Sequence, residues 1–360
     1  MELDKLLYYV EEQQNKIIAG IPLGFNRYNF ILPSIEKGDS WLVMGGSGSG
    51  KTAFTLDKMF VDPVLFAYKN QSLMDIHIDY FNLEETELRH DIRILSNIAY
   101  KLLNVEYSIK DFLNKGGNKP LLNKTGIFKP LQGFIDFFNL KTKCHTDSTP
   151  SLIKRKILES VKILKAKGVN TKADNFYHLV IIDNLKFLKK DNGHNTRKDV
   201  IDDLCLNILQ DLRLKEYIIP IVLQHQSGGN DNVVVNIKGD LVDNKLKPSL
   251  WNLGDSLDTQ TPSTNIIGLF KPHRFGIDVY PKGGYNIKQL QDNVRFLIPL
   301  KLRDDPYEGL DLAIHFKGNV SAIEELPPVA DFISNPKLYD KYSTPITTQQ
   351  VTKPTFKITI

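Results

Sequence analysis

Cysteine and long apolar runs are both scarce in this sequence. Only Cys144 and Cys205 occur among its 360 residues, and they lie far apart without the spacing of metal ligands. This pattern argues against a disulfide framework and against a zinc site, and it suits a reducing cytosol. No uninterrupted apolar run reaches the roughly 18 residues that a membrane span needs, and residues 1–16 mix acidic and amide side chains with apolar ones. We therefore expect a soluble cytoplasmic protein without a membrane partner, located in the host cytoplasm if the sequence is viral.

A strong excess of charge of either sign is also missing. Lys and Arg number 46 against 42 Asp and Glu, which gives a formal net charge of +4. Such a mild basic bias permits binding to nucleic acid without demonstrating it, so any basic patch must be local. The content of 41% hydrophobic and 24% charged residues is ordinary for a globular chain, which at this length can bury one large core or two small ones.

Short apolar runs alternate with amphipathic stretches after Gly20, which is typical of a sheet covered by helices on both faces. Within 196–215, apolar residues recur at helical spacing from Ile201 to Leu212 and predict a crossover helix between two strands. Several such units predict an α/β fold with a mostly parallel central sheet flanked by helices. The predicted strands are 40–44, 76–82, 178–182, 218–223, 264–270 and 294–301.

Four segments fall outside this pattern. Residues 1–17 predict a short helix whose apolar stripe is too narrow for an independent domain, so we expect it to dock on another surface. Residues 101–150, rich in Lys, Asn and Gly, and the polar residues 226–248 are predicted to be insertions or mobile loops. Residues 327–360 scatter Pro, Ser and Thr among few apolar side chains, which predicts a C-terminal arm that is partly extended or disordered.

Residues 45–52 have the spacing of a P-loop: a glycine, four intervening residues, then Gly50, Lys51 and Thr52. Glycines let backbone N–H groups point at phosphate oxygens, and the following helix adds its positive N-terminal end. Lys51 would neutralise the β- and γ-phosphates, and the Thr52 hydroxyl would ligate Mg²⁺. The sequence therefore predicts a nucleoside triphosphate site with Mg²⁺. The residues predicted to contact ATP are Gly45, Gly46, Ser47, Gly48, Ser49, Gly50, Lys51, Thr52 and Ala53.

Three further predicted strands are followed by polar residues that suit nucleotide hydrolysis. The apolar run 178–182 ends at Asp183, which fits the carboxylate that holds Mg²⁺ through water. Glu84 and Glu85 follow another strand, and Glu84 is the better candidate for the base that polarises the attacking water. The alternative, a helix N-terminal charge favoured by the helix dipole, suits Glu85 better. A third strand ends at Gln226, whose amide could sense the γ-phosphate and relay its loss to neighbouring loops.

These motifs, in this order, resemble the RecA-like motor domain of DnaB-type replicative DNA helicases over residues 18–326. Asp304 and Asp305, which follow Arg303, depart from the neutral residues that the family has there. They leave open that Lys301 and Arg303 are a solvated pair whose charges are balanced by these two carboxylates. Besides the P-loop, five stretches carry the resemblance. GIPLGF at 20–25 resembles the family's GIPTGF, and LPSIEKGD at 32–39 resembles its GL-x-x-G-D/E turn. FNLEE at 81–85, NLGDS at 252–256 and KLR at 301–303 resemble its FSLEM, DLRES and KxRxG, respectively.

The resemblance implies a RecA-like ATPase domain at 18–326 and a ring of six subunits that translocates on single-stranded DNA. ATP would be hydrolysed at subunit interfaces, with Glu84 as the catalytic glutamate, and Lys301 and the arginine finger Arg303 reaching in from the next subunit. The helix at 1–17 would pack on an adjacent subunit. A primase or a helicase loader would be further partners, and the absence of the family's helical N-terminal domain resembles bacteriophage helicases.

Two loops that follow predicted nucleotide-sensing strands, 189–197 and 228–247, are the candidate DNA contacts. Acidic residues are interspersed with their lysines and no aromatic residue is interleaved, so solvated loop charge is the alternative for each cation. The candidate DNA-binding cations are Lys189, Lys190, Lys238 and Lys245.

Other ATPase classes also fit parts of the pattern. A RecA-like recombinase or recombination mediator would assemble on DNA without unwinding it, but the 20–25 segment and the late Lys301 and Arg303 favour the helicase. A nucleotide-dependent assembly switch would have negligible turnover, which intact Lys51, Asp183 and Glu84 argue against. A packaging motor ranks third because no nuclease carboxylate cluster is recognisable.

Overall fold

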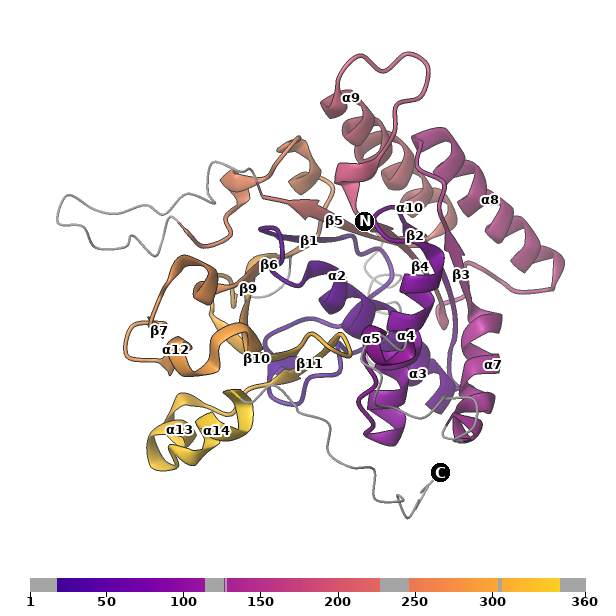
Figure 1. The fold of residues 1–360 in the computed structure, drawn as a ribbon. Coiled ribbons are helices and arrows are strands. Elements are labelled where there is room, and N and C mark those ends of the chain that lie inside the picture. Colours follow the sequence, from indigo (N-terminus) through magenta and orange to yellow (C-terminus); the bar gives the residue numbers. More distant parts are fainter. Residues whose placement is uncertain (1–17, 114–125, 127, 227–245, 304–305, 344–360) are drawn as a thin grey trace, which may run out of the picture.

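The protein is described by a computed structural model that covers residues 18–113, 126, 128–226, 246–303 and 306–343. Its centre is a nine-stranded sheet in the order β11-β10-β9-β6-β1-β5-β4-β2-β3, with helices on both faces (Figure 1). The parallel strands are β1 (Trp41–Gly45), β2 (Asp75–Asn82), β3 (Thr142–His145), β4 (Phe176–Asp183), β5 (Ile218–His225) and β6 (Asn265–Phe270). The antiparallel strands are β9 (Val294–Leu302), β10 (Leu312–Lys317) and β11 (Ala322–Glu325). The predicted α/β fold with a mostly parallel sheet is confirmed.

Helices cover the two faces of this sheet because its central strands are apolar on both sides; every residue of β1 and β4 is buried. One layer consists of α2 (Lys51–Phe54), the π-helical η2 (Thr55–Val61), α3 (Asp62–Lys69), α4 (Glu87–Leu103) and α7 (Gln132–Lys141). The other consists of α8 (Pro150–Ala166), α9 (Arg197–Asp202), η5 (Asp203–Leu209) and α10 (Gln210–Glu216). The last three form the predicted crossover helix. None of the helices in the described ranges is both long and apolar enough to cross a membrane.

The expected insertion at 101–150 needs correction. Its beginning is the last turn of α4, and its end is β3, the edge strand that pairs in parallel with β2. In between, after the short α5 (Ile109–Phe112), α7 buries Phe134 and Phe138 in the core. The polar composition hid these elements because an edge strand is only half covered and α7 buries a narrow face. Residues 114–125 and 127 of this stretch lie outside the described part.

The first part of the expected C-terminal arm is helical rather than extended. α13 (Val329–Ser334) and α14 (Lys337–Ser343) are helices, and Phe332 of α13 is buried against Tyr285 at a ring-centroid distance of 5.5 Å. They cover a small apolar cluster with α12 (Ile287–Leu290) and the hairpin of β7 (Val279–Tyr280) and β8 (Tyr285–Asn286). A few apolar residues at helical spacing thus suffice to dock this segment. The predicted helix at 1–17 and residues 344–360 lie outside the described ranges.

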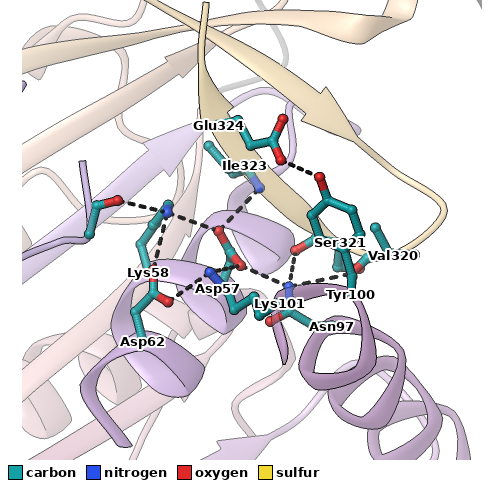
Figure 2. Close-up of polar contacts among 11 residues, drawn as sticks. Asp57, Lys58, Asp62, Asn97, Tyr100, Lys101, Val320, Ser321, Ile323 and Glu324 are labelled. Carbon is teal, nitrogen blue, oxygen red and sulfur yellow. Dashed lines mark hydrogen bonds and ion pairs between the residues drawn. The ribbon is translucent and has the colours of Figure 1, made fainter. Parts of the chain in front are cut away.

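A buried charge network holds the helix that follows the P-loop (Figure 2). Asp57 of η2 is fully buried, and its carboxylate accepts hydrogen bonds from Asn97 Nδ2 of α4 at 2.8 Å and from the Ile323 N–H of β11 at 3.1 Å. The Nζ atoms of Lys58 and Lys101 lie 3.3 and 2.8 Å from the same carboxylate. Burial alone would raise the pKa of Asp57, but the two lysines bring it below its ordinary value. Charge-assisted contacts therefore tie η2 to α4 and β11.

Candidate nucleotide-hydrolysis site

The P-loop lies where the parallel strands end. β1 ends at Gly45 and α2 begins at Lys51, as the predicted strand–loop–helix order requires. Gly45 is in register with His225 of β5, so these strand ends meet at one edge of the sheet. Gly50 has a φ of +99°, and a Cβ there would lie 2.9 Å from the Phe316 ring. Backbone conformation and space both demand a glycine immediately before Lys51.

Lys51 is buried within the curl of the loop. Its Nζ donates to the carbonyl oxygens of Gly45 and Gly46 at 2.9 and 3.0 Å, and it lies 3.4 Å from Nδ1 of His225. These contacts fix the position of the ammonium group beside the loop N–H groups and the N-terminal end of α2. A cation held at a helix N-terminus is suited to binding a phosphate chain.

Thr52 and Asp183 come together from distant parts of the sequence. Thr52 Oγ1 donates to Asp183 Oδ1 at 3.2 Å, and the Tyr80 hydroxyl donates to Oδ2 at 2.8 Å. Asp183 is buried at the end of β4, and this burial raises its pKa to about 6. A buried carboxylate beside a hydroxyl supplies oxygen ligands, and a divalent cation would offset the cost of ionising it. The donor set therefore fits Mg²⁺.

The structure separates the roles open to Glu84 and Glu85. Glu84 Oε2 accepts a hydrogen bond from Asn184 Nδ2 at 2.8 Å, and Asn184 directly follows Asp183. Glu85 instead forms an ion pair with Arg93, whose Nε lies 3.1 Å from Oε2. Glu84 thus faces the strand ends that carry the P-loop and Asp183, whereas the charge of Glu85 is already compensated.

Three residues at this site were missed by sequence reasoning: Tyr80, Asn184 and His225. Asn184 Nδ2 lies 3.2 Å from His225 Nε2, so His225 links Lys51 to Asn184 and through it to Glu84. Burial, and then the charge of Lys51, lower the pKa of His225 to about 4, which leaves the ring neutral at neutral pH. Tyr80 lies within β2, Asn184 directly follows β4, and His225 is the last residue of β5. No sequence signal marks Asn184 or His225, because strand register, which sets His225 opposite Gly45, brings them to the site.

Gln226 lies one residue beyond the end of β5. Its backbone N–H donates to the Gly45 carbonyl at 3.2 Å, and its side-chain Nε2 has no hydrogen-bond partner among the described residues. The side chain that contacts Lys51 is that of His225. Gln224 is structural, since its amide donates to the Ser256 carbonyl at 2.8 Å and accepts from Thr259 Oγ1 at 2.5 Å.

Lys301 and Arg303 are not brought near the P-loop of their own chain. β9 runs antiparallel to β6, and Lys301 pairs with Ile266, which pairs with Leu42 near the beginning of β1. Lys301 Nζ donates to the carbonyl of Ser263 at 2.7 Å, and Arg303 is exposed. Both cations therefore lie toward the opposite edge of the sheet from Gly45. Asp304 and Asp305 lie outside the described ranges.

The candidate DNA-binding lysines are only partly described. Lys189 and Lys190 are exposed on the loop that follows η4 (Leu185–Phe187), beyond the end of β4. Lys190 Nζ donates to the Asn195 carbonyl of the same loop. Lys238 and Lys245 lie outside the described ranges.

The sheet order, the P-loop and the paired Thr52 and Asp183 define a RecA-like P-loop nucleotide hydrolase fold. More particularly, the chain is 23% identical over 314 residues to a probable replicative DNA helicase of Trieres chinensis, a match that covers 85% of this chain and 58% of that protein. The chain thus spans little more than half the length of this curated relative. No protein-family model matches.

Two solved structures share the fold. A DnaB-like replicative helicase, described with its interactions with primase, has a TM-score of 0.65 at 16% identity, covering 91% of this chain and 68% of that one. The second structure, a separate ATPase domain, has a TM-score of 0.63 at 16% identity, covering 91% of this chain and 99% of that one. The resemblance to the motor domain of DnaB-type helicases is confirmed at the level of the fold.

Proposed function

We propose that this chain is the motor of a DnaB-type replicative DNA helicase, which hydrolyses ATP at subunit interfaces and translocates on single-stranded DNA. One observation carries the proposal. Lys51, Thr52, Asp183 and Glu84 gather at one edge of the sheet, while Arg303, the cation that would complete the site, lies toward the other edge. Such a site is complete only when a second subunit contributes its Arg303, as happens when subunits follow one another around a ring.

In the proposed mechanism each of these side chains has a separate role in binding or hydrolysing ATP. The loop N–H groups and Lys51 bind the phosphates, and Thr52 and Asp183 hold Mg²⁺, which neutralises phosphate charge when bound. Glu84, oriented by Asn184, polarises the attacking water. His225, between Lys51 and Asn184, responds to the γ-phosphate more directly than the expected Gln226, because it contacts both groups. Arg303 and Lys301 of an adjacent subunit stabilise the developing charge.

The partners follow from the proposed activity. Single-stranded DNA would contact Lys189 and Lys190, with Lys238 and Lys245 on the second loop, and six copies would form the ring. The DnaB-like structural neighbour interacts with a primase, and we propose a primase or a loader as a partner of this chain as well. We propose that the protein works in the cytoplasm, or in the host cytoplasm if the sequence is viral.

The test is ATP turnover with and without single-stranded DNA, together with mass in solution and unwinding of a forked duplex. We expect turnover stimulated by DNA, a ring-sized mass with nucleotide, and unwinding; Lys51→Ala, which removes the phosphate cation, is the inactive control. Stimulated turnover without unwinding would favour the recombinase class. Negligible turnover with nucleotide-dependent assembly would favour the assembly switch, and either result would reject the helicase.

A further inference from the structure

A cluster of imidazoles surrounds one buried carboxylate near the β3 end of the sheet. Asp79 of β2 is fully buried, and its Oδ2 lies 2.8 Å from His178 Nε2 on β4. Its Oδ1 lies 2.7 Å from His145 Nε2 on β3 and accepts from Ser160 Oγ of α8 at 2.8 Å. His77 Nε2, two residues earlier on β2, lies 3.6 Å from the same oxygen. Three strands and a helix thus direct polar atoms at a single group.

His77 is the member that the hydrogen bonds leave unsatisfied. Its side chain is 5% exposed, and Nε2 has no hydrogen-bond partner among the described residues although it faces Asp79. Burial lowers the pKa of His77. An unpaired buried nitrogen costs free energy, and a neutral imidazole is the form that binds metal ions.

We propose that His77, Asp79 and His178 bind a divalent transition-metal ion of the zinc class. Their ligand atoms all lie within 4.8 Å of one another. His77 and His178 are direct neighbours in the β2–β4 register, so the backbone places the two imidazoles side by side. Imidazole nitrogen with carboxylate oxygen is a ligand set for zinc and its neighbours in the first transition row, whereas Mg²⁺ prefers oxygen alone.

The surroundings of the cluster support a metal site. Hydrogen bonds from His145 and Ser160 hold the Asp79 carboxylate in place, as outer residues orient a metal-binding carboxylate. A divalent cation bound there would neutralise the charge of this fully buried carboxylate.

This site is separate from the nucleotide site and does not depend on the proposed function. Successive residues of a strand face opposite sides of the sheet, and Tyr80, next to Asp79, donates to Asp183. A bound ion would join β2 to β4, one residue along β2 from the contact between Tyr80 and Asp183. We therefore assign the ion a structural role. Cysteine spacing argued against a zinc site, but these ligands come from strands far apart in sequence.

The test uses full-length chain without a histidine tag, stripped with a chelator and dialysed against Zn²⁺ or Co²⁺. We expect one tightly bound equivalent by elemental analysis and visible Co²⁺ absorption typical of nitrogen and oxygen ligands. His77→Gln and His178→Gln should each lose that equivalent. His315→Gln is the matched control, because His315 is also buried beside a carboxylate and has an unpaired Nδ1. Asp183→Asn should keep the equivalent, because its carboxylate belongs to the nucleotide site.

Three results would overturn the proposal. The first is that the native chain binds no more Zn²⁺ than folded His77→Gln, and the second is that Asp183→Asn loses the ion instead. In either case the cluster is a hydrogen-bond network that binds no metal. If the glutamine variants do not fold, the test is made on the native chain. Zn²⁺ must then raise its unfolding temperature near neutral pH, and this stabilisation must disappear in acid, where protons displace the metal. A native chain with neither this shift nor Co²⁺ absorption contains no such site.

Discussion

At the residue scale, adjacent carboxylates at positions 84 and 85 have different partners. Glu84 accepts from Asn184, whereas Glu85 is paired with Arg93. We expect Glu84→Gln to lower ATP turnover by about 100-fold or more, because it removes the group proposed to polarise the attacking water while keeping size and a hydrogen bond. Nucleotide binding should persist. The measurement is steady-state turnover alongside binding of a fluorescent nucleotide.

Glu85→Gln is the matched control, since it makes the same chemical change one residue away. It should retain most of the turnover and lose about 1 kcal/mol of unfolding free energy with the partly exposed ion pair. A larger turnover loss in Glu85→Gln than in Glu84→Gln would reverse the assignment.

Asp183 gives a pH-dependent prediction without nucleotide or metal. Its pKa is raised from 3.8 to about 6 in the folded chain, so the protonated form stabilises the fold below about pH 4, and this contribution is lost as pH rises to about 6. The loss is on the order of 3 kcal/mol. Asparagine does not titrate. In chelator, Asp183→Asn should therefore gain stability relative to the native chain across this window, as measured by denaturant unfolding.

Adding Mg²⁺ and ATP provides the internal control for Asp183. A cation at the carboxylate should reverse the difference above about pH 6, so that the native chain becomes the more stable one. A difference that stays constant with pH would contradict the burial of an ionisable group at this position.

At the scale of elements, the Asp57 network ties the helix after the P-loop to α4 and β11 (Figure 2). Asp57→Asn removes the fully buried carboxylate that Lys58 and Lys101 share and leaves them only Asp62, and we expect it to destabilise the fold by about 3 kcal/mol near neutral pH. Because the pKa of Asp57 is lowered in the fold, its contribution is present above about 3.8 and fades as pH falls through the folded pKa.

Asp211→Asn is the comparison for Asp57→Asn, because Asp211 pairs with Lys215 on the exposed face of α10. It should cost less than about 0.5 kcal/mol. Equal effects of the two substitutions in chemical unfolding would mean that the buried network contributes nothing beyond a surface pair.

Elements differed in how well the sequence predicted them. The runs that became β1, β4, β5, β6 and β9 are largely apolar, and β2 alternates apolar residues with His77 and Asp79, so their apolar content identifies all six. β3, β10 and β11 lie toward the two ends of the sheet and mix polar with apolar residues, which blurs the signal. The P-loop was predictable because its ligands are adjacent in sequence. Asn184 and His225 were not, because strand register alone brings them together.

At the scale of the whole molecule, Arg303 lies toward the opposite edge of the sheet from its own P-loop, and in the proposed ring the two would act in different copies. Arg303 is close enough to Arg213 that its charge, after burial, lowers the pKa of that residue. Arg213 in turn donates to Ser40 Oγ at 2.9 Å, just before β1 begins. Subunits placed head to tail around a ring would bring this edge of one copy to the P-loop edge of the next.

Mixing two inactive variants tests this arrangement. Lys51→Ala and Arg303→Ala should each be inactive alone, but an equal mixture should regain turnover, because about a quarter of random interfaces pair an intact Lys51 with an intact Arg303. Lys51→Ala mixed with Glu84→Gln is the control: both residues serve the same site from one subunit, so no mixed interface is complete. Regained turnover in the first mixture alone would establish that Arg303 acts across the interface. No regain in either, under conditions where the subunits exchange, would mean that Arg303 belongs to the surface and that the catalytic cation comes from elsewhere.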